Sequence, residues 1–224
     1  HEGTCPTSNA YITRTWVLSD ACDNVTSHIQ TITITDVTAP TFTVPANIAV
    51  CKTNANTYDA GTGVTGVPTN LADNCTLPVN LAVTYVDEPH VGSATEVGTI
   101  LRLWTVKDAC FNTTTATQTI TLNPAPVASI TALPASFCLP ATGGTDVTAT
   151  LSALPAVNYT YHITLPNATI VNNYTATQNI SAPGTYTFTG YVVDNTTNCS
   201  SAVVSAVTEA LLFPDFTISN VVGK

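Results

Sequence analysis

Apolar and polar residues alternate with a period of two along much of the chain, which is the pattern of half-buried strands. The clearest case lies between residues 100 and 121. Ile100, Arg102 and Trp104 fall on one face of a predicted strand, the segment D-A-C-F-N at 108–112 supplies turn residues, and Q-T-I-T at 118–121 alternates again. The stretch therefore predicts two antiparallel strands joined by a polar turn.

An earlier segment, residues 12–33, repeats this stretch without gaps at an offset of 88 residues. The identical pairs are Ile12/Ile100, Arg14/Arg102, Trp16/Trp104, Asp20/Asp108, Ala21/Ala109, Cys22/Cys110, Asn24/Asn112, Thr26/Thr114 and 30–33/118–121. We interpret each copy as the last two strands of an immunoglobulin-like module. Trp16 and Trp104 are then predicted core residues, in preference to sugar-stacking platforms, and each arginine either covers its tryptophan or pairs with a carboxylate at the pole.

The remaining alternation predicts further strands on both sides of two proline-containing linkers, 36–40 and 123–126. These strands are 41–50, 81–86, 147–152, 159–164, 169–174, 184–193 and 202–208. The predicted fold is all-β, with tandem immunoglobulin-like β-sandwich modules arranged as a rod. The predicted boundaries are the C-terminal half of a module at 1–39, a complete module at 40–124, a third module at 125–211 and the start of another at 212–224.

Charge is scarce and acidic, and this changes which partners we expect. Only 8% of the residues are charged and the formal net charge is −9. Nucleic-acid binding requires basic patches, so we expect no nucleic-acid partner. No apolar run reaches about 18 residues, so we expect no membrane insertion.

Seven cysteines without a C-x-x-C spacing indicate an oxidising compartment, and hence secretion. Cys5 and Cys22 cannot pair with each other, because the strand between them holds them too far apart. Their partners lie elsewhere and are not predicted. In an immunoglobulin-like sandwich the loops that carry Cys75 and Cys110 share a pole, so these two are predicted to pair. Cys138 and Cys199 are predicted to form a second bridge. Cys51 lacks an equivalent partner and is expected to be a buried free thiol, with an intermolecular bond as the alternative.

Acidic residues lie in several predicted turns, where Asp caps its own backbone. This turn chemistry is favoured over calcium binding, for which Asp20, Asp36, Asp73 and Asp108 are weak candidates. The four histidines are scattered at no ligand spacing, and no nucleophile, zinc or phosphate-loop motif is present. We therefore expect no enzyme and no cofactor apart from a possible Ca²⁺ ion.

The combination of Cys51, D-N-C at 73–75, R-x-W-x-x-x-D-A-C-x-N at 102–112 and Q-T-I-T at 118–121, with a D-x-T-A-P linker, resembles the hyalin-repeat-like modules of giant Bacteroidetes surface proteins. The residues after 125 resemble the immunoglobulin- or PKD-like domains found beside those repeats. Two departures stand out. Asp23 and Phe111 occupy a turn position where the family has Gly, and the middle copy lacks a cysteine equivalent to Cys5.

This resemblance implies long cell-surface adhesins exported by type 9 secretion, the SprB-type filaments of gliding bacteria among them. The leading hypothesis is therefore an extracellular structural and adhesive segment. Its expected partners are neighbouring modules of the same long chain, surface polysaccharide or other cells. One alternative is a set of carbohydrate-binding accessory modules of a secreted hydrolase. The other is a self-polymerising filament subunit, whose incomplete first module is completed by strands from a neighbour.

Overall fold

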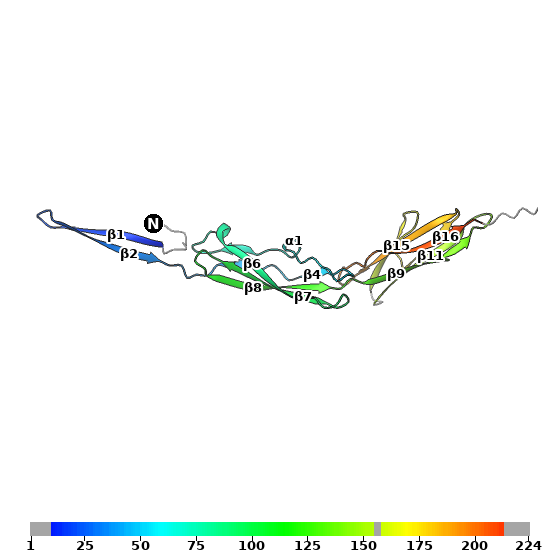
Figure 1. Ribbon diagram of the computed structural model, residues 1–224, viewed down its shortest axis with the longest axis horizontal. Helices are drawn as coiled ribbons and strands as arrows, with labels where there is room; N and C mark the ends of the chain where they lie inside the picture. The colour runs from blue at the N-terminus through cyan, green and yellow to red at the C-terminus, as the bar shows by residue number, and fades with distance from the viewer. Residues whose placement is uncertain (1–9, 155–157, 213–224) are drawn as a thin grey trace, which may run out of the picture. The chain divides into compact units, whose positions relative to one another are not determined.

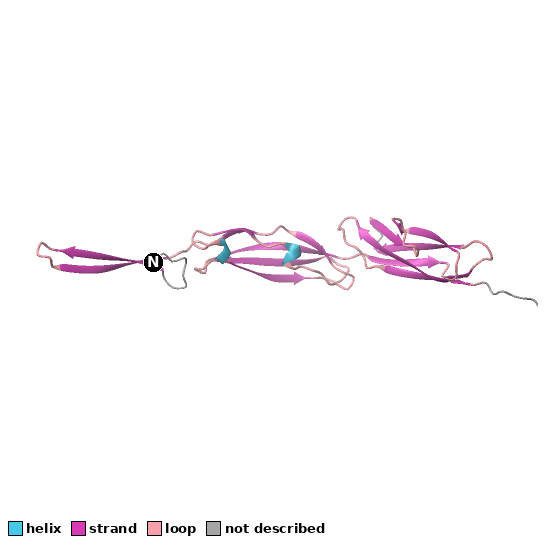
Figure 2. Cartoon of the chain, turned by 90° about the horizontal axis from the view of Figure 1, so that it is seen from above, coloured by secondary structure: helices cyan, strands magenta, loops and turns pink. Residues whose placement is uncertain are grey.

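The computed structural model describes residues 10–154 and 158–212, and the regular secondary structure of this part of the chain is almost entirely β-strand (Figures 1 and 2). Its contacts divide it into two compact units. The first comprises residues 1–50, 60–91 and 98–121, and the second comprises residues 51–59, 92–97 and 122–224. The all-β, sandwich-type fold predicted from the alternating pattern is confirmed.

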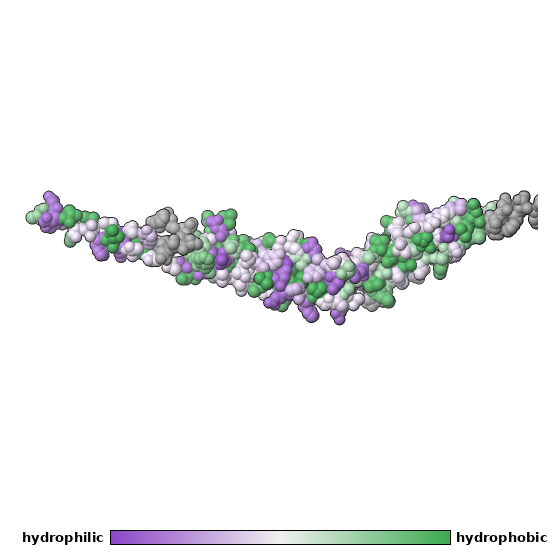
Figure 3. Space-filling view, in the orientation of Figure 1, coloured by the Kyte–Doolittle hydropathy of each residue, from purple (hydrophilic) through white to green (hydrophobic). Residues whose placement is uncertain are grey.

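The first element is a hairpin of β1 (Ala10–Ser19) and β2 (Val25–Ile34), paired antiparallel so that Trp16 lies opposite His28. Nearly every residue of it is exposed, and apolar surface shows on it in Figure 3. Trp16 is 55% exposed, so its prediction as a core residue is wrong for this structure. The physical reason is that no further strand covers this hairpin in the described part of the chain.

The repeat of this hairpin, β7 and β8, lies inside a sheet of order β4-β8-β7-β6. Its strands are β4 (Ile48–Cys51), β6 (Ala82–His90), β7 (Gly98–Lys107) and β8 (Thr113–Asn123). A small sheet pairs β3 (Thr41–Thr43) with β5 (Thr69–Ala72), and two short helices, α1 (Thr62–Thr65) and the 3₁₀ helix η1 (Pro78–Asn80), complete the unit. Along β7 every second residue is buried, and Trp104 is only 2% exposed, as its core prediction requires.

The single strand predicted at 41–50 is two strands in the structure, because β3 ends at Thr43 and β4 begins at Ile48. Pro45 lies between them. A proline has no N–H to donate to a ladder, so the chain leaves one sheet there and joins the other.

The two D-A-C-x-N turns have the same backbone geometry. In each, an aspartate side chain accepts hydrogen bonds from the N–H and the side-chain amide of the asparagine four residues later: Asp20 from Asn24, and Asp108 from Asn112. The residue before that asparagine has a positive φ, 62° at Asp23 and 71° at Phe111. The turn thus retains its left-handed position without the glycine that the resembling family has there.

The C-terminal sandwich packs a five-stranded sheet, β10-β16-β15-β12-β13, against a three-stranded sheet, β14-β11-β9. The bounds are β9 (Val127–Leu133), β10 (Ser136–Cys138), β11 (Thr145–Leu154), β12 (Tyr159–Thr164), β13 (Ile170–Val171), β14 (Thr175–Ile180), β15 (Gly184–Asp194) and β16 (Val204–Leu211). Val147, Leu151, Ile163, Phe188 and Val192 form the centre of its core, each 1% exposed or less.

Candidate functional site

A disulfide joins Cys51, the last residue of β4, to Cys199 in the loop between β15 and β16. The two residues are 148 positions apart in the sequence. The predicted Cys138–Cys199 bridge is therefore wrong, and Cys138 is an exposed free thiol. The prediction of Cys51 as a buried free thiol is also wrong. Both predictions treat each module as containing its own bridges, whereas in the described residues the segment 51–59 belongs to the same compact unit as residues 122–154 and 158–212.

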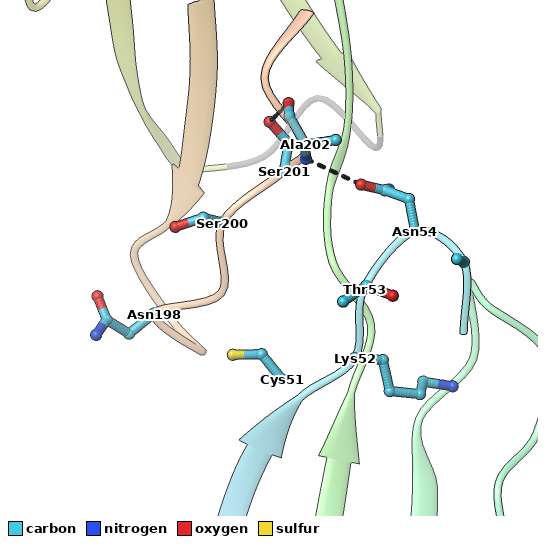
Figure 4. Close-up of a pocket in the computed structure, with 9 residues that line it drawn as sticks. Cys51, Lys52, Thr53, Asn54, Asn198, Ser200, Ser201 and Ala202 are labelled. Carbon is cyan, nitrogen blue, oxygen red and sulfur yellow. Dashed lines mark hydrogen bonds between the residues drawn. The ribbon is translucent and has the colours of Figure 1, made fainter. Parts of the chain in front are cut away.

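The residues that follow Cys51 make hydrogen bonds that reinforce the connection formed by this disulfide (Figure 4). Asn54 accepts a bond from the N–H of Ala202 at 2.9 Å and donates one to the carbonyl of Pro126 at 3.0 Å. Lys52 is 1% exposed and donates from Nζ to the carbonyls of Ser93 and Glu96, at 2.5 and 2.6 Å. The shallow depression beside the disulfide is lined by these and other small polar residues. Since its one charged side chain donates to carbonyl groups, we assign this depression a structural role.

The predicted Cys75–Cys110 bridge is not formed. Cys110 is half-buried and free, whereas the exposed Cys75 accepts a weak hydrogen bond at Sγ from Asn74 Nδ2, at 3.4 Å. The loops that carry the two cysteines do meet, but they meet through other groups, because Thr76 Oγ1 accepts from the N–H of Ala109 at 3.2 Å. Cys22 is an exposed free thiol, and Cys5 lies outside the described residues.

Arg102 is the most heavily engaged side chain of the first unit, and it is 1% exposed. Its guanidinium binds Asp87 through two hydrogen bonds, from Nε at 2.7 Å and from Nη2 at 2.8 Å. It also donates to Thr65 Oγ1 and to the carbonyl of Ala60, each at 2.7 Å. The hydrogen bond to Asp87 holds the pKa of Arg102 above its ordinary value, against the opposing effect of burial.

Arg102 also lies over aromatic rings, with Cζ 4.2 Å from the centroid of Tyr85 and 5.8 Å from that of Trp104. The role of covering the tryptophan, anticipated from the sequence, is confirmed at this position. The carboxylate partner, Asp87, lies within strand β6 opposite Arg102, whereas the alternative role anticipated a carboxylate at the pole. In the first copy, Arg14 lies 5.5 Å from the centroid of Trp16. Arg14 and Trp16 are both exposed, so the same local arrangement exists there without a core around it.

Three of the four weak calcium candidates lie together, and the fourth does not. A carboxylate oxygen from each of Asp36, Asp73 and Asp108 lies within 4.8 Å of the other two. These residues come from the linker before β3, the loop after β5 and the turn after β7. Two like unit charges about 4 Å apart repel by about 1 kcal/mol in water and about 4 kcal/mol at an effective dielectric constant of 20. Asp20 lies outside this cluster and serves only its own turn.

Two further aspartates are held in their charged form by turn geometry. Hydrogen bonds from Asn24 lower the pKa of Asp20, the largest contribution coming from the Asn24 side chain. The N–H of Thr196 is the main cause of the lowered pKa of Asp194, with a smaller contribution from Thr197. Asp194 begins the turn that carries Cys199, so its carboxylate helps to position the disulfide.

The histidines show no arrangement suited to catalysis in the described part of the chain. The His162 ring stacks on Tyr191 at 4.6 Å between centroids and shares a hydrogen bond with Asn172, which is packing on an exposed sheet face. Lys52, Thr65 and Gln118 were missed from the sequence. All three are buried polar residues: Lys52 follows β4, Thr65 ends α1 and Gln118 lies on β8. Only Gln118 belongs to a sequence repeat, the Q-T-I-T segment.

No protein-family model matches the chain, and no curated protein matches its sequence. Solved structures similar to it include the fibronectin(III)-like modules of Clostridium thermocellum CbhA, with 10% identity over 81% of this chain and 100% of that one, and a TM-score of 0.35. A putative membrane anchored protein from Corynebacterium diphtheriae matches with 10% identity over 96% of this chain and 61% of that one, with a TM-score of 0.30. Mouse cadherin-23 EC22-24 matches with 13% identity over 91% and 75%, with a TM-score of 0.26.

These likenesses are to modular β-structures, and the fold assignment itself rests on the strand order and core of this chain. None of the helices in the described residues is long and apolar enough to cross a membrane.

Proposed function

We propose that this chain is an extracellular structural and adhesive segment of a large bacterial surface protein, built from consecutive β-sandwich modules at 40–124 and 125–211, with parts of further modules at 1–39 and 212–224. The observation that carries the proposal is the disulfide between Cys51 and Cys199. Disulfides persist in oxidising compartments, which supports a location outside the cell. The proposal assigns the chain no catalytic role.

The position of this disulfide suits a protein that is pulled from its ends. Tension applied along the chain reaches Cys51, crosses to Cys199 through the sulfur atoms and continues toward residue 224. Residues 52–198, which include β6, β7 and most of the C-terminal sandwich, are therefore outside the path of the force. This property suits a surface adhesin under shear, because the parts of its modules that the disulfide encloses then remain folded while the chain is stretched.

Single-molecule stretching between the two ends of the chain tests the proposal. Reduction should add roughly 500 Å to the extended length, at about 3.4 Å for each of the 148 residues that separate the two cysteines. The Cys138→Ser variant is the matched control and should behave like the natural chain. A gain of only roughly 200 Å on reduction, which is the span from Cys138 to Cys199 at about 3.4 Å per residue, would contradict the proposal.

The sequence resemblance supports a finer version, in which the modules belong to the hyalin-repeat-like class of gliding or attachment adhesins secreted by the type 9 system. The equal hydrogen bonding of the two D-A-C-x-N turns is in keeping with such repeats. Surface labelling of the producing cells with an antibody to this segment tests this version. The finer assignment fails if the antibody labels permeabilised cells but does not label intact cells.

A second candidate function is self-assembly, and the exposed face of the β1–β2 hairpin favours it. The equivalent face of β7 is covered, and there Arg102 and Gln118 reach groups on residues 46–87. Strands equivalent to β3–β6 from a neighbouring subunit would give Arg14 and Gln30 the same partners. Sedimentation of the chain over a range of concentrations tests this, and a monomer that persists at high concentration would exclude it.

A further inference from the structure

Asp73 has one carboxylate oxygen that is fully engaged and one that is buried without a partner. Oδ2 accepts hydrogen bonds from the N–H groups of Cys75 and Thr76, at 2.9 and 2.7 Å. Oδ1 is buried, with less than 1 Å² of accessible surface, and receives no hydrogen bond. A buried carboxylate oxygen without a donor is costly, and such an atom in a folded protein usually contacts an ion or a water molecule. Turn chemistry accounts for Oδ2 and leaves Oδ1 unexplained.

The residues around Asp73 indicate which kind of group this carboxylate suits. Asp73 lies in a group with Asp36 and Asp108, in which one carboxylate oxygen of each residue is within 4.8 Å of the others. Asp108 is only 4% exposed. Neither Asp73 nor Asp108 has a Lys, Arg or His within ion-pair distance among the described residues. Negative charges this close together repel one another, and a cation relieves that repulsion.

We propose that Asp36, Asp73 and Asp108 bind a divalent cation, and that this cation is Ca²⁺. Calcium takes six to eight oxygen ligands at roughly 2.3–2.6 Å, so oxygens on opposite sides of one ion are about 4.6–5.2 Å apart. The 4.8 Å limit for the three carboxylates agrees with that span. Water molecules complete the coordination at such a site. Mg²⁺ requires a smaller, nearly ideal octahedron and gives up its water reluctantly, so it suits the site less well.

The ion would connect three segments that are distant in the sequence. Asp36 belongs to the linker that follows β2, and its carbonyl already accepts a hydrogen bond from Asn112 Nδ2 at 3.2 Å, while its Oδ1 accepts one from Asn74 at 3.3 Å. Asp73 and Asp108 belong to the loops after β5 and β7. A bound cation therefore fixes the linker onto those loops and makes its position depend on calcium. This inference does not depend on the adhesive function.

Isothermal titration of the chelator-treated chain with CaCl₂ tests the site directly. We expect one site with a Kd between about 10 µM and 1 mM, within the range of calcium sensors and extracellular modules. We also expect the melting temperature to rise in millimolar CaCl₂ relative to EDTA. The variant Asp73→Asn keeps an oxygen to accept the two N–H groups and removes the charge, so it should weaken binding at least about tenfold while preserving the fold.

Asp20→Asn is the matched control, because Asp20 makes the same turn contacts as Asp108 and lies outside the cluster. It should bind Ca²⁺ as the natural chain does. Asp36→Asn provides a second variant outside the strands and should also weaken binding. The proposal is overturned if the natural chain shows no heat of binding and melts at the same temperature in CaCl₂ and EDTA. Binding by Asp73→Asn that equals binding by the natural chain would overturn it as well.

Discussion

Trp104 donates a hydrogen bond from Nε1 to Oε1 of Gln118 at 3.2 Å, and Trp16 makes the same bond to Gln30 at the same distance. The first pair is buried and the second is exposed. The Gln118 side chain also donates hydrogen bonds from Nε2 to the carbonyls of Ala46 and Thr65, at 2.9 and 2.8 Å. The local geometry of the hairpin is therefore encoded within the hairpin, whereas its burial depends on strands from elsewhere in the module.

Replacement of Gln118 by Ala should destabilise the first unit by about 2–4 kcal/mol, since three polar groups lose their partner, two of them in buried hydrogen bonds. The same replacement at Gln30 should cost less than about 0.5 kcal/mol, because its surroundings are exposed. Urea unfolding followed by Trp104 fluorescence in a Trp16→Phe background measures both. Equal losses in the free energy of unfolding would contradict this prediction, because the two glutamines would then contribute equally to stability.

Arg102→Lys should cost about 2–4 kcal/mol, because an ammonium group cannot reproduce the paired bonds to Asp87 and leaves other buried groups unsatisfied. Arg14→Lys is the matched variant and should change the free energy of unfolding by less than about 0.5 kcal/mol. Thermal unfolding of the two variants compares them at one pH. A stable Arg102→Lys protein would show that the guanidinium network contributes little.

Acid should weaken the turn that carries Cys199. The pKa of Asp194 in the folded chain is below its ordinary value of 3.8, mainly because of the Thr196 N–H. Its contribution to stability is thus complete above about pH 4 and is lost as the pH falls through the lowered pKa. Asp194→Asn should be less stable than the natural chain near neutral pH, and the difference should shrink toward pH 2. Melting curves from pH 2 to 7 measure this; a constant difference would contradict it.

The disulfide should be visible as a cross-linked peptide pair. Trypsin cuts after Lys52 and after Lys107, so it places Cys51 and Cys199 in separate peptides. Digestion without reduction should therefore yield a species in which the peptide that ends at Lys52 is linked to the peptide that begins at residue 108. Cys51→Ser should abolish it, and Cys138→Ser should leave it unchanged. Mass spectrometry distinguishes the outcomes. Reduction of the natural chain should lower its stability by about 2–5 kcal/mol.

The sequence predicted well wherever the information is local. Alternation along 100–107 and 118–121 identified the strands, and the repeat at an offset of 88 identified two equivalent hairpins with equivalent turns. Arg102 was correctly expected to cover Trp104. Each of these inferences concerns residues that are neighbours on one strand or across one turn.

The errors concern contacts between segments that are distant in the sequence. The partner of Cys199 lies 148 residues away, and nothing near Cys51 shows that its segment packs against the following sandwich. Trp16 looked like a core residue because its strand is identical in pattern to that of Trp104, but burial requires covering strands. The acidic cluster is also a contact between distant segments. The sequence identified four candidate aspartates, but only the fold shows that three of them lie together and that Asp20 does not.

The most direct test of the repeat interpretation is acrylamide quenching of two single-tryptophan chains, Trp104→Phe and Trp16→Phe, at low protein concentration. The account predicts strong quenching and red-shifted emission from Trp16, which is 55% exposed, and weak quenching with blue-shifted emission from Trp104, which is 2% exposed. Equal quenching of the two tryptophans would contradict the claim that one repeat is covered by its module and the other is not.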